Sequence, residues 1–362
     1  MFTPERLILA RKRRRLTLAA LSRASDVSAQ SITAFENSRK VPSDETLLSL
    51  AKALSYPVDF FYGGAHEEIQ ADAASFRALS KMSAIERDST LASGAVALML
   101  NSWIEERFRL PKPNVPTYPD CSPEEAAERV RASWGLGESP VPNMVRILES
   151  NGVRVFSLSS DCEDADAFSA IRSGVPFVFL SIKKTGERGR FDAAHELGHL
   201  VLHCEYRIPH GPAAESEANK FASAFLMPRS ALFSQGLENA SIERILSAKR
   251  VWGVSAMALT YRLRDLSIIS EWKYNQIVKE LARRGYRKSE PGSSLGRETS
   301  ELLAKVFKEL RRRGVKPAEV AQELNIYSSE LSEHVFGLVP VQISGGGQRS
   351  NPVRPDLRVI NS

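Results

Sequence analysis

The stretch from Arg190 to His203 contains two histidines four residues apart, in the order His195-Glu196-Leu-Gly-His199. Positions four apart lie one turn apart on the same face of a helix, so both imidazoles can bind one metal ion. The glutamate after the first histidine lies beside the open position of such a metal, where its carboxylate can take a proton from water. Apolar residues flank the motif. The stretch therefore predicts a buried helix that carries part of a zinc site.

A second helical pattern follows, with acidic residues at its start and Pro228 at its end. A carboxylate from this helix would complete a site with three protein ligands and one open position. Both Glu215 and Glu217 could supply it, but they point about 200° apart around the helix. His203 lies one turn after His199, and ligands on three consecutive turns of one straight helix fit a tetrahedron poorly. We therefore expect His203 beside the metal ligands rather than among them.

Three motifs in this region together resemble the ImmA/IrrE family of zinc metallopeptidases: His195-Glu196-x-x-His199, Glu215-x-x-Ala-Asn219 and Met227-Pro228. The resemblance implies a Zn²⁺ site with the ligands His195, His199 and Glu215. It implies that Glu196 is the general base of peptide hydrolysis. Asn219 is expected to support the ligands from outside the set, as is His203.

Two further residues near the motif allow alternative interpretations. Arg190 resembles a position that is basic in the family, but an ion pair with Asp192 or Glu187 explains it equally well. His210 is predicted on a loop, where it could donate a hydrogen bond to a substrate oxyanion. Gly198 is expected to leave space close to the metal.

The overall composition is compatible with a nucleic-acid partner and a reduced compartment. Lys and Arg outnumber Asp and Glu by 49 to 43, which gives a net charge of +6 and a pI near 9.2. No signal peptide is visible, and the longest apolar run, 92–100, is too short to span a bilayer, so we expect no membrane partner. The three cysteines are scattered without metal-type spacing, which favours a cytoplasmic protein: Cys121, Cys162 and Cys204.

Residues 1–64 are predicted to form four short helices, and Thr17, Ser28 and Ser43 are placed to cap the last three. The pattern resembles the phage Cro/repressor type of helix-turn-helix, a DNA-binding domain whose third helix enters the major groove of operator DNA, commonly as a dimer. At position 18 the family usually has Gln, whereas this chain has Leu18. The alternative is a protein-interaction module. The basic run Arg11–Arg15 is interpreted as a solvated helix end that adds phosphate attraction.

The resemblance also implies which side chains contact DNA. Those expected to face the bases are Ala29, Gln30, Ser31 and Thr33. Those expected near the phosphate backbone are Asn37, Ser38, Arg39 and Lys40.

Between the two motifs, residues 65–120 are interpreted as a connecting helix and a proline-rich linker. Alternation and aromatic residues in three runs predict a small antiparallel sheet whose edge could hold a peptide substrate: 153–158, 167–171 and 175–180. After residue 241 the pattern is helical. Residues 317–336 form either a second helix-turn-helix or a helical pair packed on the peptidase, and the last twenty residues are expected to be flexible.

The predicted fold class is therefore mainly α with a small α+β domain, which is zincin-like. The expected units are residues 1–64 (helix-turn-helix), 65–120 (connector), 121–240 (metallopeptidase), 241–340 (helical domain) and 341–362 (tail). The leading hypothesis is a transcriptional regulator of prophage or stress-response type that cleaves itself or a related repressor. The alternative is a regulator whose peptidase-like domain is a non-catalytic sensor or interaction module, as in antitoxins and immunity repressors.

Overall fold

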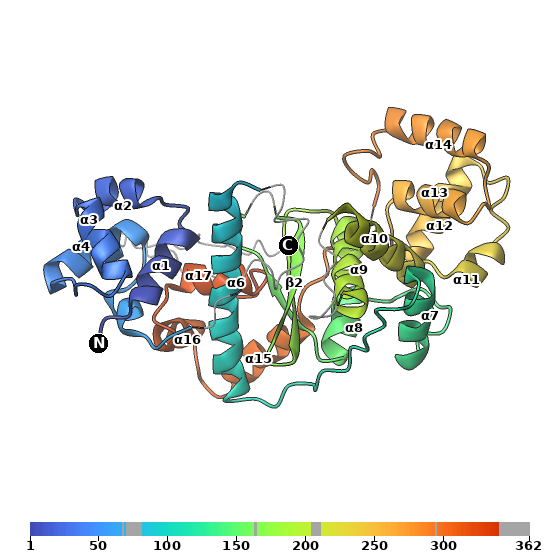
Figure 1. Ribbon diagram of the computed structural model, residues 1–362. Coiled ribbons are helices and arrows are strands. Elements are labelled where there is room, and N and C mark those ends of the chain that lie inside the picture. Colours follow the sequence, from blue (N-terminus) through green and yellow to red (C-terminus); the bar gives the residue numbers. More distant parts are fainter. Residues whose placement is uncertain (67–68, 70–81, 163–164, 204–210, 294, 340–362) are drawn as a thin grey trace, which may run out of the picture.

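The N-terminal helices form a compact bundle (Figure 1). The computed structural model describes the chain apart from residues 67–68, 70–81, 163–164, 204–210, 294 and 340–362, so Cys204, His210 and the predicted tail lie outside the described residues. Thr17, Ser28 and Ser43 each accept a hydrogen bond from the backbone N–H three residues later, which confirms the predicted caps. The elements are α1 (Pro4–Arg13), α2 (Leu18–Ser25), α3 (Ala29–Glu36), α4 (Asp44–Leu54) and the 3₁₀ helix η1 (Val58–Tyr62).

A three-stranded sheet lies at the centre of the molecule, and its strand order is β1-β3-β2. The strands are β1 (Arg154–Ser157), β2 (Ala167–Arg172) and β3 (Val175–Leu180). β2 and β3 form an antiparallel hairpin, but β1 pairs with β3 in parallel. The prediction of an antiparallel sheet is therefore wrong for β1. The segment after β1 carries the chain to the far edge, and the hairpin then places β3 in the middle.

The two faces of this sheet belong to different cores. Cross-strand register aligns Phe156, Phe179 and Phe168 on one face, and these rings stack with centroids 6.4 and 4.4 Å apart. We call this the phenylalanine face. Helix α6 (Ala84–Glu105) lies on the same side as this face, and α9 lies on the other side (Figure 1). Alternation along each strand thus sends adjacent residues into separate cores.

Helix α6 is a structural layer rather than a connector. Its residues from Ser89 to Leu98 are all buried, and they are apolar or small hydroxyl-bearing residues. A Cβ at Gly94 would lie 2.9 Å from Phe168 Cζ, so this glycine lets α6 approach the sheet closely. The interpretation of 65–120 as a connecting helix and linker is therefore corrected for α6.

The second core contains the helices on the other side of the sheet. Helix α9 packs against β2, β3 and the neighbouring helices α7, α8 and α10. Ser122 accepts from Glu125 N and caps α7. The helices are α7 (Pro123–Ser133), α8 (Met144–Ser150), α9 (Gly186–Leu202), α10 (Pro212–Leu226), α11 (Arg229–Phe233), α12 (Ile242–Trp252), α13 (Ala256–Asp265) and α14 (Glu271–Arg283).

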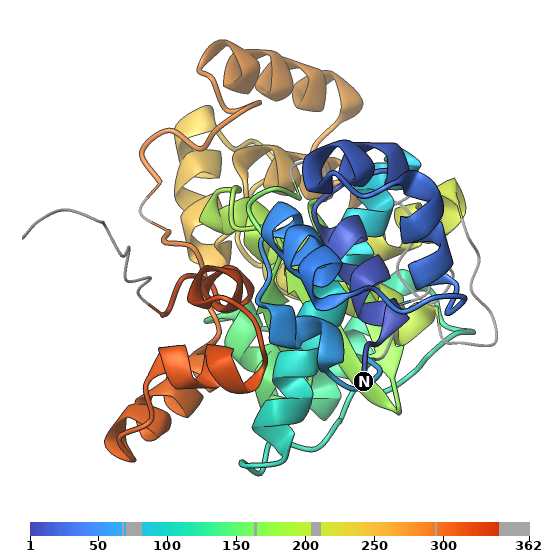
Figure 2. The ribbon, with the colours of Figure 1, turned by 90° about the vertical axis from the view of Figure 1, so that its left-hand side faces the viewer.

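The last helices return to the first core. They are α15 (Glu301–Arg312), α16 (Pro317–Glu323) and α17 (Ser328–His334), and in both ribbon views they lie apart from α14 (Figure 2). Residues 241–340 thus contribute to both cores. The pair at 317–336 packs through α17 on α6 and on β1, which is a strand of the segment predicted as the peptidase. Glu149 accepts from Ser300 and Leu302 N at the start of α15, and burial raises its pKa to about 7.

Ion pairs fix the helix-turn-helix to this returning segment. Arg13 is fully buried, and its guanidinium lies 2.7 Å from both Glu330 and Asp161 and 2.8 Å from Glu333. Arg11 pairs with Glu36 at 2.6 Å. The interpretation of Arg11–Arg15 as a solvated helix end is therefore wrong for both residues, because carboxylates distant in the sequence neutralise them.

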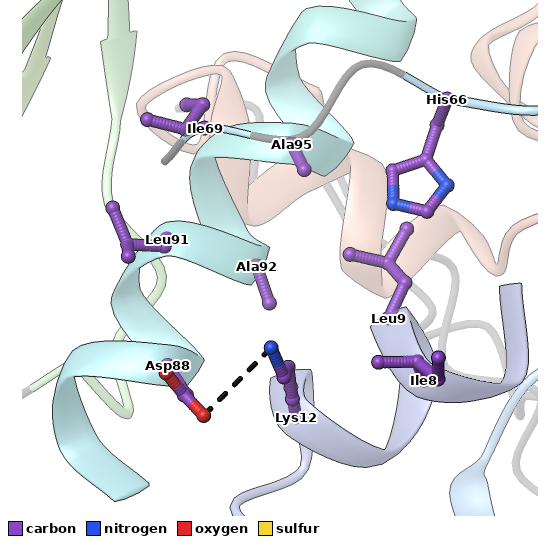
Figure 3. A pocket seen from close by; sticks show the side chains of 9 residues that line it. All are labelled: Ile8, Leu9, Lys12, His66, Ile69, Asp88, Leu91, Ala92 and Ala95. Atoms are coloured by element: carbon purple, nitrogen blue, oxygen red, sulfur yellow. Dashed lines mark ion pairs between the residues drawn. The ribbon is translucent and has the colours of Figure 1, made fainter. Parts of the chain in front are cut away.

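The packing between α1 and α6 leaves a small cavity of about 50 Å³, and the Lys12–Asp88 ion pair lies along its side (Figure 3). A space of this size holds at most a few water molecules. No helix in the described ranges combines the length and the apolar character that crossing a membrane requires.

Candidate metal centre

Helix α9 carries the histidine motif and is fixed near its start. The Thr185 hydroxyl accepts from Arg188 N at its start. The Arg190 guanidinium donates to Glu298 at 2.5 Å and to the carbonyl of Val141 at 2.9 Å. Glu298 also accepts from Met144 N at the start of α8. Arg190 is therefore a buried anchor between α8, α9 and the segment before α15.

Neither Asp192 nor Glu187, the two carboxylates predicted as possible partners of Arg190, forms an ion pair with it. Asp192 instead pairs with Lys184 at 2.7 Å, and Glu187 pairs with Lys249 at 3.0 Å. No local pattern points to Glu298 as the partner, because it lies more than a hundred positions away.

The structure brings His195, His199 and Glu215 together. The two Nε2 atoms lie 3.1 Å apart, and they lie 3.2 and 3.3 Å from the two carboxylate oxygens of Glu215. Metal–ligand distances of about 2.05 Å in a tetrahedral zinc site place neighbouring ligand atoms roughly 3.3 Å apart. Two imidazoles and one carboxylate therefore sit at the spacing of three tetrahedral corners. These residues could hold a metal ion.

Outer contacts orient the imidazoles. Nδ1 of His195 lies 3.1 Å from Oδ1 of Asn219, so its N–H can point away from the ligand cluster and leave Nε2 as a lone-pair donor. Nδ1 of His203 lies 2.9 Å from Nδ1 of His199, and its Nε2 lies 3.0 Å from Glu217. The structure thus places Asn219 and His203 around the ligand cluster and Glu217 one contact further out.

Burial raises the pKa of Glu215, but the hydrogen bonds between its carboxylate and the two imidazoles lower it by more. Its pKa therefore lies well below the usual range of a carboxyl group. Metal ligands must be deprotonated, and this carboxylate meets that requirement. Burial also lowers the pKa of His203, which favours a neutral ring.

Glu196 follows His195 on α9, on the side of the helix that packs against β2. It is 3% exposed, and its Oε2 accepts a hydrogen bond of 2.7 Å from the Ser169 hydroxyl on β2. Ser169 was not predicted as a site residue. A signal was available, because Ser169 is the polar member of the strand face that it shares with Ala167 and Ile171.

Gly198 lets α9 and α10, which carry the three candidate ligands, come together. A Cβ at this position would lie 3.1 Å from Phe221 Cδ1 and 3.2 Å from the Cα and carbonyl oxygen of Ala218. The space beside Gly198 is therefore filled by α10, whereas the sequence predicts that it lies open beside the metal. This close approach brings Glu215 of α10 within reach of the two histidines of α9.

The predicted DNA-reading helix lies on the outside of the N-terminal bundle. Ile32 and Phe35 bury one side of α3 against α1 and α2. Five of the predicted DNA contacts are exposed: Gln30, Asn37, Ser38, Arg39 and Lys40. Three are partly buried: Ala29, Ser31 and Thr33. Leu18 packs against the core, which accounts for an apolar residue at that position.

Comparison with protein families gives one match for the N-terminal bundle and one for the segment that carries the candidate metal ligands. Residues 7–61 match the family described as helix-turn-helix, and residues 148–264 match the peptidase family described as the IrrE N-terminal-like domain. The second match covers the three strands and the helices from α9 to α13. No curated protein matches the chain. The chain therefore carries a DNA-binding helix-turn-helix domain followed by a metallopeptidase-like domain of the IrrE type.

Proposed function

We propose that this chain is a cytoplasmic transcriptional regulator with a zinc-dependent endopeptidase centre, which relieves repression by cleaving itself or a related repressor. The observation that carries the proposal is the convergence of His195, His199 and Glu215, with Glu196 next to His195 on α9. The helix-turn-helix match supports the regulatory half of the proposal. The prophage or stress-response setting follows from the same family resemblance.

Zinc fits the donor set, because two neutral imidazoles, one carboxylate and an open fourth position are typical of catalytic zinc sites. His195, His199 and Glu215 would hold the ion. When bound, zinc would supply a Lewis acid that acidifies water and polarises a peptide carbonyl.

Glu196 would perform the proton transfers. Its carboxylate takes a proton from the attacking water as the new C–O bond forms, and it gives that proton to the amine nitrogen as the C–N bond breaks. The Ser169 hydroxyl holds one carboxylate oxygen and so fixes the direction in which Glu196 presents the other. β2 ends the described sheet, so its outer edge could hold an extended substrate by main-chain hydrogen bonds.

The N-terminal domain would bind double-stranded operator DNA through α3. Gln30 and its neighbours would read bases, while Arg39 and Lys40 would contact phosphates. Domains of this type bind two half-sites as dimers, so we propose a homodimer on DNA.

Metal content tests the centre directly. Native mass spectrometry of the full chain, dialysed free of chelator and then supplied with zinc, should show one tightly held zinc per chain. Glu215→Ala should weaken that binding strongly. Glu217→Ala is the matched control, because Glu217 lies on the same helix, is half exposed and contacts only His203 among the described histidines. Wild-type protein that binds no zinc would refute the proposal.

Glu196→Gln distinguishes the peptidase from a non-catalytic sensor, the second candidate. The sensor is favoured by the ion pair between the buried Arg13 and the half-exposed Asp161, which links the helix-turn-helix to the segment that leads into β2. A peptidase should lose cleavage and derepression in this variant while it keeps zinc and DNA binding. A sensor should respond to its signal as the wild type does.

A further inference from the structure

A cleft of about 400 Å³ is lined in part by β2 and α9 and is separate from the three candidate metal ligands. One wall is the segment 113–117, and the other is the tip of the β2–β3 hairpin. The lining is mainly apolar, and its apolar side chains are Pro113, Val115, Pro116, Ile171, Pro176 and Leu200. The remaining lining side chains offer only an amide and hydroxyls, so no formal charge faces the cleft.

Hydrogen bonds hold the segment 113–117 in place as one wall of the cleft. Asn114 N donates to the carbonyl of Asn151 at 2.9 Å, and Tyr118 N donates to the carbonyl of Val201 on α9 at 2.7 Å. The indole of Trp134 donates to the Asn114 carbonyl at 3.0 Å. Backbone bonds at both ends therefore preserve the cleft, as expected of a preformed binding site.

Two lining residues of the cleft follow Ser169 and Glu196 on the same strand and the same helix. Ile171 lies two residues after Ser169 on the same face of β2, a distance of about 7 Å along a strand. Leu200 lies four residues after Glu196 on α9, about 6 Å along a helix. Both elements that hold the proposed general base thus continue directly into the cleft. An extended peptide along the edge of β2 would place a side chain there.

We propose that this cleft is the subsite that receives an uncharged, apolar side chain of the substrate within a few residues of the scissile bond. The inference rests on the proposed peptidase function and adds its substrate class. A volume of this size accommodates a leucine or phenylalanine side chain with room for its neighbour. A charged side chain would lose water without gaining a partner, so the cleft excludes it.

Disulfide capture tests the cleft without any need for turnover. The full-length Thr117→Cys protein is offered two disulfide probes of equal length, one ending in a phenyl group and one in a carboxylate, under mild reduction. Mass spectrometry should show at least tenfold preference for the phenyl probe. Ser150→Cys, an exposed site on α8 outside the lining, is the matched control and should show no such preference. Equal capture of both probes at Thr117→Cys would overturn the inference.

Cleavage specificity gives the second readout. A peptide library treated with zinc-loaded protein is sequenced, and only cuts that disappear with Glu196→Gln are kept. One position should be apolar, and Ile171→Lys should shift that position toward acidic residues without changing the others. An unchanged profile in a folded, active Ile171→Lys protein would contradict the subsite. If no Glu196-dependent cuts are found, the proposed function fails, whereas probe capture still reports on the cleft separately.

Discussion

Gly198→Ala should weaken zinc binding, although the added methyl group contacts none of the three proposed zinc ligands. Carbon atoms in ordinary contact lie about 3.5–4.0 Å apart. The added Cβ would lie 3.1 Å from Phe221 and 3.2 Å from the backbone of Ala218. Because the backbone of Ala218 cannot rotate away as a side chain tip can, α10 must retreat by roughly 0.4 Å. A zinc site tolerates ligand displacements of only about 0.2 Å.

We therefore expect the affinity for zinc to fall about 10- to 100-fold, the range typical of lost support around a metal site. Competition with a chromophoric chelator measures the dissociation constant. The matched control is Gly189→Ala on the same helix, where an added Cβ meets nothing within 4 Å. That variant should keep its zinc affinity and gain up to about 1 kcal/mol of stability from helix propensity. If both variants bind zinc within twofold of the wild type, Gly198 does not set the ligand geometry.

Three further predictions concern the rest of the chain. Arg13→Ala should lower the free energy of unfolding by about 3–5 kcal/mol, against less than about 1 kcal/mol for Lys12→Ala, whose ion pair is half exposed; urea titration measures both. Because the folded-state pKa of Glu149 is raised to about 7, its contribution is complete below pH 4.5 and is lost as pH rises through 7. The wild type should thus lose about 3 kcal/mol relative to Glu149→Gln over that window, and parallel stability curves would contradict this. Arg39→Ala and Lys40→Ala should each reduce the salt dependence of DNA binding by about one counterion, as measured by fluorescence anisotropy; an unchanged slope would exclude phosphate contacts.

Features that depend on neighbours in the sequence could be predicted. The caps at Thr17, Ser28 and Ser43 are local, because a side chain oxygen satisfies an N–H three residues away. The spacing of His195 and His199 is equally local, and their convergence with Glu215 needed only the packing of two consecutive helices. The strands were recognised from alternation, although alternation carries no information on which strand lies in the middle.

Features that depend on distant partners could not be predicted. A buried arginine such as Arg13 has the same local signature as a surface arginine, and its partner Glu330 lies 317 positions away. Arg190 and Glu298 present the same difficulty. Ser169 shows why a site can be only partly visible in sequence. Its contact with Glu196 depends on the packing of β2 against α9, which the motif does not encode.

The phenylalanine face has a consequence for how this chain can be divided. A fragment limited to residues 148–264 would retain Phe156, Phe168 and Phe179 but lose α6, which covers them. An uncovered aromatic surface on a three-stranded sheet favours aggregation in water. The peptidase-like domain therefore depends on α6, which follows the DNA-binding domain in the chain, to cover this apolar surface. Cutting the chain at the boundaries of the two family matches would therefore not give two independent domains, because α6 lies outside both matches and covers the phenylalanine face.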